Sequence, residues 1–290
     1  MFQRALQGYE KAWGPDHTST LDTVNNLGGL YAHLGKVDEA EKMYQRALQG
    51  CEEAWGPDHT STLDTVNNLG ILYVDQGKLD EAEKMYQRAL QGYEKSWGPD
   101  HTSSLNTVNN LGLLYAYRGK LDEAEKMYQR ALQGKEKAWG PDHTSTLDTV
   151  NNLGLLYADQ GKPDAEKMYR RALQGYEKAL GPDHTSSLRT VNNLGNLCMS
   201  QGRLHEAEKM YRRALEGYEK ALGSENVARY RPALNTMWRL GHLFAAQGHL
   251  GEAKEMYSRA RPGFQALLGP SSDFCQRLDF RIASLDSTQA

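Results

Sequence analysis

Cysteine is scarce in this sequence, and its arrangement excludes one common class of domain. The 290 residues include only Cys51, Cys198 and Cys275. Their odd number and wide spacing argue against a disulfide framework and favour a reducing compartment. No Asn-x-Ser/Thr acceptor for N-glycosylation is present, which agrees with that interpretation. We therefore expect a cytoplasmic protein.

Two further absences limit the kinds of partner. The 34 Lys and Arg residues against 37 Asp and Glu residues give a formal net charge of −3. Non-specific nucleic-acid binding needs a basic footprint, which this balance does not provide. No uninterrupted apolar stretch approaches the roughly 20 residues of a membrane-spanning helix, and no signal peptide opens the chain. We expect neither a nucleic acid nor a membrane as partner.

Motifs for catalysis and for metal or cofactor binding are also missing. The sequence has no CxxC, no HExxH and no Gly-rich phosphate-binding loop. Asp-His pairs are frequent, but no Ser or Cys is placed in a way that suggests a catalytic triad. We expect no enzymatic activity, no metal and no cofactor.

The dominant feature of the sequence is a 42-residue repeat, marked by Trp13, Trp55, Trp97 and Trp139. One unit reads GPDHTSTLDTVNNLGILYVDQGKLDEAEKMYQRALQGYEKSW and returns with few changes. Because the chain begins in the middle of a unit, we expect that an earlier helix is missing or lies in a longer parent protein. We divide the chain into a leading half-repeat with one helix (1–13), repeats at 14–55, 56–97, 98–139, 140–180 (one residue short) and 181–222, a divergent repeat with an insertion (223–268), and a C-terminal capping helix and tail (269–290).

Each unit contains two predicted helices. In the repeat 56–97 the first covers roughly 62–76, with Ser61 and Asp64 resembling a capping box and Gly77 ending the helix. The second begins at Asp80 as N-cap and continues to Trp97. Neither helix can bury its apolar stripe alone, so the pairs must stack into a solenoid. Gly92, in the middle of the second helix, recurs in every unit and indicates close helix packing or a bend.

The unit resembles the tetratricopeptide repeat, whose defining positions are filled here by Leu69, Gly70, Tyr73, Gly77, Ala82, Tyr86 and Ala89. The resemblance implies an all-α solenoid, a right-handed superhelix of antiparallel helix pairs. The longer 42-residue unit resembles the kinesin-light-chain subclass. It is even more similar to the repeat arrays of fungal NB-ARC, NLR-like proteins, which share the ALQGYEK segment of the second helix.

In this family the first helix of each pair lines the concave face, and here it carries an asparagine pair in five units. An Asn amide both donates and accepts, so it can clamp a peptide backbone whatever its side chains. Alternatively, one Asn of each pair bonds to the adjacent helix and sets the stacking. The pairs are Asn25 and Asn26, Asn67 and Asn68, Asn109 and Asn110, Asn151 and Asn152, and Asn192 and Asn193.

Charged residues flank this asparagine ladder and change sign along the chain. The position three residues before each pair holds Asp22, Asp64, Asn106, Asp148 and Arg189, and Asn235 in the last unit. We therefore predict a bipolar groove that takes a basic peptide segment toward the first units and an acidic one near Arg189 and Arg239. The alternative is that these charges are solvated surface. Trp238 is either an anchor in the groove or a plug where the solenoid ends.

These observations predict a non-catalytic scaffold that binds an extended peptide or a partner protein on its concave face. Two alternatives stay open: the ligand-sensing repeat region of a fungal NLR-like receptor, and a cargo adaptor similar to kinesin light chain. Self-association through exposed ends is a further possibility. We assign a structural role to the linker histidines, because one per layer, with layers about 8–10 Å apart, forms a line and not a coordination cluster. They are His17, His59, His101, His143 and His184.

Overall fold

The chain is built almost entirely from helices that follow one another in antiparallel pairs. The computed structural model describes residues 2–288, and over that range it contains fifteen α-helices and no β-strand. The helices form two compact units, Met1–Gly140 and Pro141–Ala290. The all-α prediction is confirmed.

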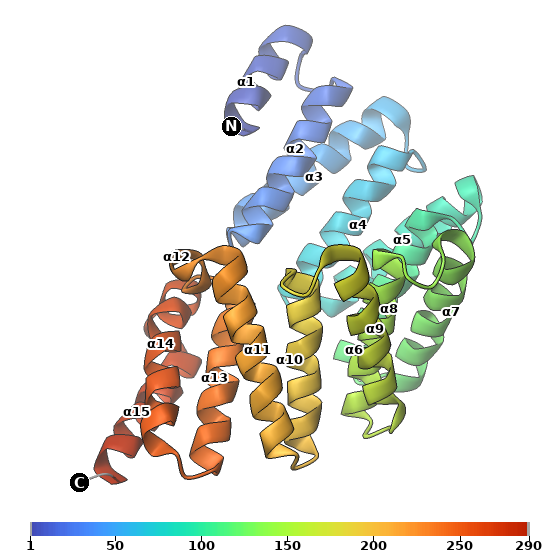
Figure 1. Cartoon of the computed structure of the whole chain (residues 1–290). Helices are drawn as coiled ribbons and strands as arrows, with labels where there is room; N and C mark the ends of the chain where they lie inside the picture. Colours follow the sequence, from blue (N-terminus) through green and yellow to red (C-terminus); the bar gives the residue numbers. More distant parts are fainter. Residues whose placement is uncertain (1, 289–290) are drawn as a thin grey trace. The chain divides into compact units, whose positions relative to one another are not determined.

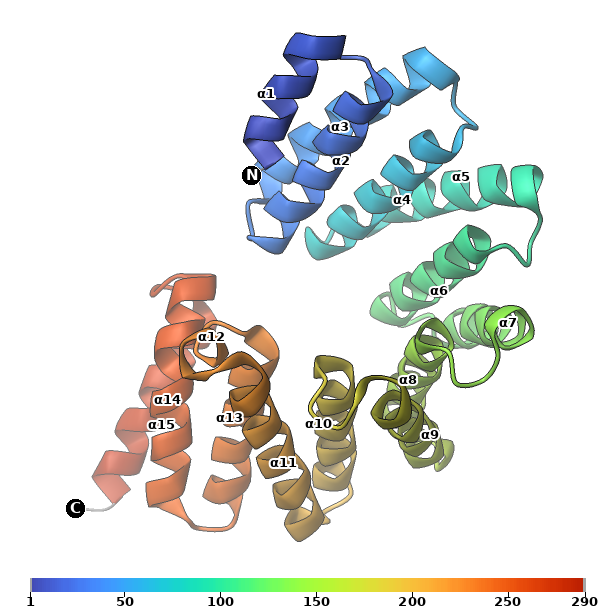
Figure 2. The same ribbon diagram turned by 45° about the horizontal axis from the view of Figure 1, so that its top comes forward.

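The first unit contains seven helices, and each packs on the next (Figure 2). The first helix of each pair has 16 residues and the second has 19. Their bounds are α1 Phe2–Trp13, α2 Thr18–His33, α3 Val37–Trp55, α4 Thr60–Asp75, α5 Leu79–Trp97, α6 Thr102–Tyr117 and α7 Leu121–Trp139.

The second unit continues the same alternation, with its later helices standing side by side (Figure 1). Their bounds are α8 Thr144–Asp159, α9 Asp164–Leu180, α10 Thr185–Ser200, α11 Leu204–Leu222, α12 Ser224–Val227, α13 Arg231–Ala246, α14 Leu250–Leu268 and α15 Asp273–Thr288.

The linker histidines start the first helix of five pairs. His59 Nδ1 accepts a hydrogen bond from the backbone N–H of Ser61 at 3.3 Å, which satisfies a donor that the helix itself leaves unpaired. The preceding tryptophan lies over this ring, with 5.0 Å between the ring centroids of Trp55 and His59. The structural role predicted for the histidines agrees with this geometry. The hydrogen bond recurs at His17, His101, His143 and His184, and the tryptophan contact recurs at His17 and His101.

Two predicted caps are wrong. The capping box of Ser61 and Asp64 does not form, because α4 starts at Thr60 with His59 as N-cap, and Asp64 bonds elsewhere. Asp80 is not an N-cap either: α5 starts at Leu79 after Lys78. The reason is the tight turn at Gly77 (φ +73°), which brings the chain into helical geometry two residues earlier.

Glycines allow the two helices of a pair to approach closely. A Cβ added to Gly92 in α5 would lie 2.5 Å from Leu63 Cδ2 of α4, and one added to Gly70 in α4 would lie 2.6 Å from the Tyr86 ring. Real Cβ atoms essentially never come that close, so any larger residue at these positions would force Leu63 or the Tyr86 ring to move. The predicted close packing at Gly92 is therefore confirmed, and the same contact recurs at Gly50, Gly134, Gly175, Gly217 and Gly263.

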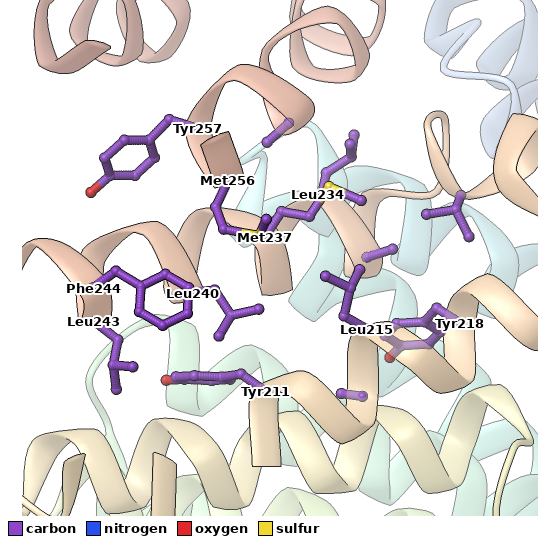
Figure 3. Close-up of a cluster of buried hydrophobic side chains, with 14 of the residues drawn as sticks. Tyr211, Leu215, Tyr218, Leu234, Met237, Leu240, Leu243, Phe244, Met256 and Tyr257 are labelled. Atoms are coloured by element: carbon purple, nitrogen blue, oxygen red, sulfur yellow. The ribbon is translucent and has the colours of Figure 1, made fainter. Parts of the chain in front are cut away.

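Aromatic and aliphatic side chains fill the space between layers. In the second unit, α11, α13 and α14 surround one continuous cluster that includes Tyr211, Leu240 and Tyr257 (Figure 3). The inserted residues of the divergent repeat form the short helix α12, whose Val227 joins this cluster. Helix α15 packs on α14 and adds Cys275 and Leu278. The cluster thus extends through the last helix.

Candidate functional site

Asparagine side chains link the first helices of successive pairs within the first unit. Asn68 Nδ2 donates to Asn25 Oδ1 at 3.2 Å, and Asn110 Nδ2 donates to Asn67 Oδ1 at 3.3 Å. Thr107 Oγ1 also donates to Asn67 Oδ1, at 3.3 Å. The first Asn of a pair therefore accepts from the next layer, while the second donates to the previous one.

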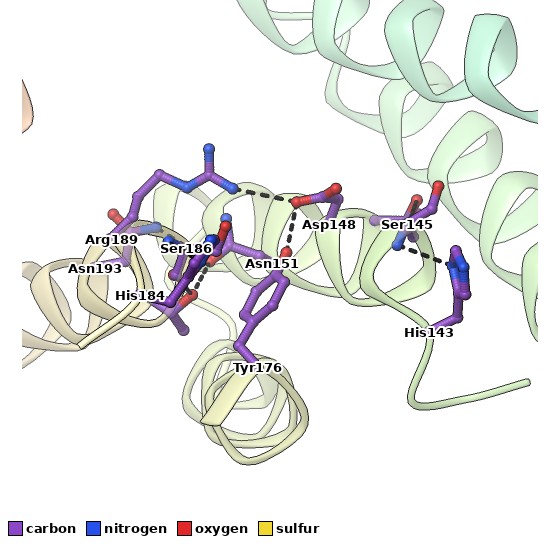
Figure 4. Close-up of polar contacts among 11 residues, drawn as sticks. His143, Ser145, Asp148, Asn151, Tyr176, His184, Ser186, Arg189 and Asn193 are labelled. Atoms are coloured by element: carbon purple, nitrogen blue, oxygen red, sulfur yellow. Dashed lines mark hydrogen bonds and ion pairs between the residues drawn. The ribbon is translucent and has the colours of Figure 1, made fainter. Parts of the chain in front are cut away.

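The second unit repeats this arrangement (Figure 4). Asn193 Nδ2 and Thr190 Oγ1 both donate to Asn151 Oδ1 at 3.2 Å. Asn192 Oδ1 accepts from Thr236 Oγ1 at 3.0 Å. The proposed stacking role is thus visible for Asn25, Asn67, Asn151 and Asn192. A direct role of the ladder in peptide binding stays a prediction, with Asn26 exposed and Asn109 and Asn152 half-buried.

The acidic residues beside the ladder are held by tyrosines of the second helix. Tyr93 Oη donates to Asp64 Oδ1 at 2.5 Å, and Tyr176 Oη donates to Asp148 Oδ1 at 2.5 Å. Burial, reinforced by these carboxylates, raises the pKa of both tyrosines well above the usual range. Both hydroxyls therefore stay protonated and continue to donate. Each carboxylate keeps further lone pairs for a ligand.

Arg189 reaches back to one of these carboxylates. Its Nη2 lies 3.2 Å from Asp148 Oδ1, and both side chains are about half exposed (51% and 50%). An exposed pair of this kind contributes about 0–1 kcal/mol to stability, so Arg189 can exchange Asp148 for an anionic ligand at little cost.

Five predicted site residues meet around one open pocket of about 320 Å³ between α10 and α13. They are Arg189, Asn192, Asn193, Trp238 and Arg239. Asn196, Tyr218, Pro232 and Asn235 complete the lining and were not predicted as site residues. Asn196 could have been found, because it places an amide where the other repeats have Gly29, Ile71, Leu113 and Leu155.

Trp238 connects this pocket to the end of the helix stack. Arg239 lies over its ring, with the guanidinium carbon 5.0 Å from the centroid, which is cation–π geometry. The ring centroid of Phe274 in α15 lies 5.8 Å from that of Trp238. The two interpretations of Trp238, anchor and plug, are therefore compatible, since one ring lines the pocket and packs against the final helix.

His242, which sequence reasoning missed, lies one turn beyond Trp238. The two rings meet edge to face with 4.4 Å between centroids, and His242 Nε2 is buried without a hydrogen-bond partner in the part of the chain that the structure describes. Burial, with Arg281 and Arg239 nearby, lowers the pKa of His242 to about 4. The imidazole is therefore neutral at physiological pH.

The sequence matches the model of a known protein family. The family model described as tetratricopeptide repeat matches five overlapping segments, residues 19–95, 61–137, 103–165, 145–220 and 192–266. The chain belongs to the tetratricopeptide repeat family. None of the curated proteins compared with this tetratricopeptide repeat chain matches it.

Several solved structures share this tetratricopeptide repeat fold. BtubC (BKLC) from P. vanneervenii has a TM-score of 0.63 at 23% identity, over 77% of this chain and 90% of that one. The nearly identical TPR-like repeats of a putative kinesin light chain from Podosopora anserina give 0.56 at 21% identity, over 71% and 98%. A signal-transduction ATPase from Pyrococcus horikoshii with a tetratricopeptide repeat sensor gives 0.66 at 16%, over 99% and 43%. At these identities the likeness concerns the fold.

Neither a membrane-spanning helix nor a metal-binding cluster is found among the residues that the structure describes. Across residues 2–288 every helix is too short or too polar to span a bilayer. Over the same range, no three His, Cys, Asp or Glu side chains are grouped so that they could hold a metal ion. The pocket at Trp238 and the asparagine ladder are thus the candidate site.

Proposed function

We propose that this chain is a non-catalytic scaffold that binds an extended peptide of a partner protein along the exposed face of its first helices. Tetratricopeptide repeat proteins are generally protein-interaction scaffolds, which supports the general assignment. The observation that carries the proposal is the pocket at Trp238, where two arginines, several amides and an aromatic ring meet. Such a lining suits a peptide with acidic side chains.

The asparagine amides supply the part of the recognition that is independent of sequence. Asn68 and Asn110 each use one N–H in the ladder, which leaves a second N–H and the carbonyl oxygen for a peptide backbone. Asp64 supplies negative charge in the first unit. Arg189 and Arg239 supply positive charge in the second. Each unit by itself would thus favour its own kind of segment, a basic one beside Asp64 and an acidic one beside Arg189 and Arg239.

The test is a pull-down from lysate followed by mass spectrometry, with the parent chain and an Asn68→Ala, Asn110→Ala, Asn152→Ala triple variant. Circular dichroism and thermal melting must first show that the variant is folded. A partner held by the parent and lost by the folded variant supports the proposal. Equal recovery of every partner contradicts it, and moves the binding surface away from the ladder.

A second candidate use of the same face is ligand sensing within a larger nucleotide-binding receptor. The fold likeness to the archaeal ATPase with a tetratricopeptide repeat sensor favours it, because the match covers 99% of this chain. The cargo-adaptor alternative has similar support in the kinesin-light-chain repeats. In each case we place the protein in the cytoplasm, and its peptide-binding face is the surface that contacts the partner.

Self-association through exposed ends is a further possibility, and light scattering tests it.

A further inference from the structure

A second pocket, of about 230 Å³, opens between α13 and α15. Apolar and aromatic side chains form its walls, two arginines supply positive charge, and no acidic residue belongs to the lining. It shares only Trp238 with the pocket proposed for the peptide. The lining consists of Trp238, Phe274, Arg277, Leu278 and Arg281.

Two buried polar atoms beside this pocket lack a hydrogen-bond partner among the residues that the structure describes. They are His242 Nε2 and the hydroxyl oxygen of Tyr257, a residue that is only 1% exposed. The His242 ring contacts the pocket wall, with 4.4 Å to the ring centroid of Trp238, and it contacts Tyr257, with 5.7 Å between the ring centroids. Buried polar groups almost always have a partner, so two unpaired atoms at one place indicate a bound molecule.

The preceding repeat contains a hydrogen bond that the last repeat lacks. There Tyr211 Oη donates to Asn196 Oδ1 at 2.9 Å. In the last repeat Tyr257 occupies the place of Tyr211, and His242 occupies that of Asn196. Within the described chain Tyr257 Oη has no partner. The last repeat therefore has a free donor where the preceding repeat has an internal hydrogen bond.

Arg281 supplies positive charge beside both unpaired atoms. Burial lowers the pKa of His242, and Arg281 and Arg239 lower it further. Burial raises the pKa of Tyr257, and Arg281 opposes that rise. Both groups are therefore neutral at physiological pH, and both can donate a hydrogen bond, the tyrosine through its hydroxyl and the imidazole through Nε2–H. An anion at Arg281 would find these two donors beside the guanidinium.

The acidic residue between the two pocket arginines does not balance their charge. Asp279 lies between Arg277 and Arg281 in the sequence, but Arg261 of α14 holds it, with 3.0 Å between Nη2 and Oδ2. Arg277 Nε donates to a backbone oxygen, that of Asp273, at 3.3 Å. The pocket thus combines positive charge with aromatic walls.

We propose that this pocket is a second ligand site, which binds a small organic anion consisting of an aromatic ring and a carboxylate group. The carboxylate binds Arg281 and takes hydrogen bonds from Tyr257 and His242. The ring packs against the side chains of Trp238 and Phe274. The site is separate from the proposed peptide-binding function and requires no peptide.

Size and wall chemistry favour an organic anion over water or inorganic phosphate. One water molecule needs only about 10–15 Å³, so the 230 Å³ of this pocket admits a larger molecule. Phosphate would pair with the arginines but would leave Trp238, Phe274 and Leu278 facing water. A carboxylate on an aromatic ring covers these apolar walls and still accepts from several donors.

The test titrates the full chain with sodium benzoate, followed by chemical shifts in NMR spectra. Benzyl alcohol supplies the ring without the charge, and acetate supplies the charge without the ring. We expect benzoate to bind at least about 10-fold more tightly than either, and Arg281→Gln to weaken benzoate binding about 10-fold. The matched control is Arg229→Gln, which removes the same charge at an exposed residue outside the pocket and should leave the affinity unchanged.

Two tyrosine variants separate ligand binding from folding. Tyr257→Phe removes a hydroxyl that has no partner in the described part of the free chain, so it should weaken benzoate binding several-fold without lowering the melting temperature. Tyr211→Phe removes a hydroxyl that donates to Asn196, so it should lower the melting temperature and leave benzoate binding unchanged. A purely structural role of both hydroxyls would not produce this reversal.

Three outcomes would overturn the proposal: no measurable binding of benzoate, equal affinities for benzoate and acetate, or equal affinities of the parent and Arg281→Gln chains for benzoate. The last result would place benzoate elsewhere on the chain. Binding that raises the pKa of His242, because the carboxylate offsets the charges of Arg239 and Arg281, supports the proposal. None of these measurements involves a peptide, so a failure here leaves the proposed peptide-binding function intact.

Discussion

Leu63 of α4 lies directly over the backbone of Gly92 in α5, where an added Cβ would be 2.5 Å from its Cδ2 atom. Two opposing effects decide what Gly92→Ala does. Alanine stabilises a helix interior by about 1 kcal/mol relative to glycine. Overpacking against a fully buried leucine costs about 1–3 kcal/mol. The difference predicts net destabilisation of up to about 2 kcal/mol, measured by urea unfolding.

Gly8 provides the matched control. It occupies the same place in α1, but a Cβ added there meets no atom within 4 Å. Only the propensity effect remains, so Gly8→Ala should stabilise by up to about 1 kcal/mol. Equal effects of the two substitutions would show that the leucine contact does not set the requirement for glycine.

The histidine caps give a second prediction. His59→Ala removes the acceptor for the Ser61 N–H, and loss of an N-cap costs about 1 kcal/mol. His59→Asp restores an acceptor and adds negative charge at the helix N-terminus, so it should recover most of the loss. Thermal melting of the three chains measures the effect. If His59→Asp is no better than His59→Ala, the stacking with Trp55 is the main contribution of the histidine.

Asn67 and Asn26 should differ in their effect on stability. Asn67→Ala removes the acceptor of the half-buried Asn110 amide, and a desolvated donor left unpaired costs about 1–3 kcal/mol, whereas Thr107 keeps its bond to the Ser103 carbonyl oxygen. Asn26 is exposed, so Asn26→Ala should change stability by less than about 0.5 kcal/mol. Equal costs in urea unfolding would contradict the interhelix role of the first asparagine.

Lowering the pH should reduce the stability of the folded chain, because His242 in the last repeat is buried in its neutral form. Its pKa is about 4 in the folded chain, and that of an unfolded histidine is about 6.5. Between these values the unfolded chain binds more protons, so stability falls as the pH is lowered through this window, by at most about 1.4 kcal/mol per pH unit. His242→Leu places there the residue type of Leu113 and Leu155. The parent should lose about 1–2 kcal/mol more than this variant between pH 7 and pH 4.5, and parallel pH profiles of the two chains would contradict the effect.

Much of the fold could be predicted from the sequence because the repeat is nearly exact. Apolar spacing at Val66, Leu69 and Tyr73 fixes the buried stripe of the first helix, and glycine at position 77 fixes its end. The helix starts were less predictable. Serine and aspartate are the usual N-caps, and a histidine that accepts through Nδ1 beside a tryptophan leaves no distinctive sequence pattern.

The sequence predicts which residues form most of the candidate site, but it does not predict how these residues are arranged around one pocket. The first-helix register identifies Arg189, Asn193, Trp238 and Arg239 as neighbours along two helices. Their meeting in one pocket depends on how α10 packs beside α13, which the insertion before α13 obscures in the sequence. Asp64 illustrates the same limit, since its bond to Tyr93 joins residues 29 positions apart.

The most direct test of peptide binding is charge reversal at the pocket. An acidic peptide that the parent chain binds is titrated against Arg239→Glu and against Arg229→Glu, an equal change of net charge at an exposed residue outside the pocket lining. We predict that Arg239→Glu weakens binding at least 10-fold while Arg229→Glu changes it less than 2-fold. Equal affinities of the two variants would show that acidic peptides do not bind in the pocket between α10 and α13.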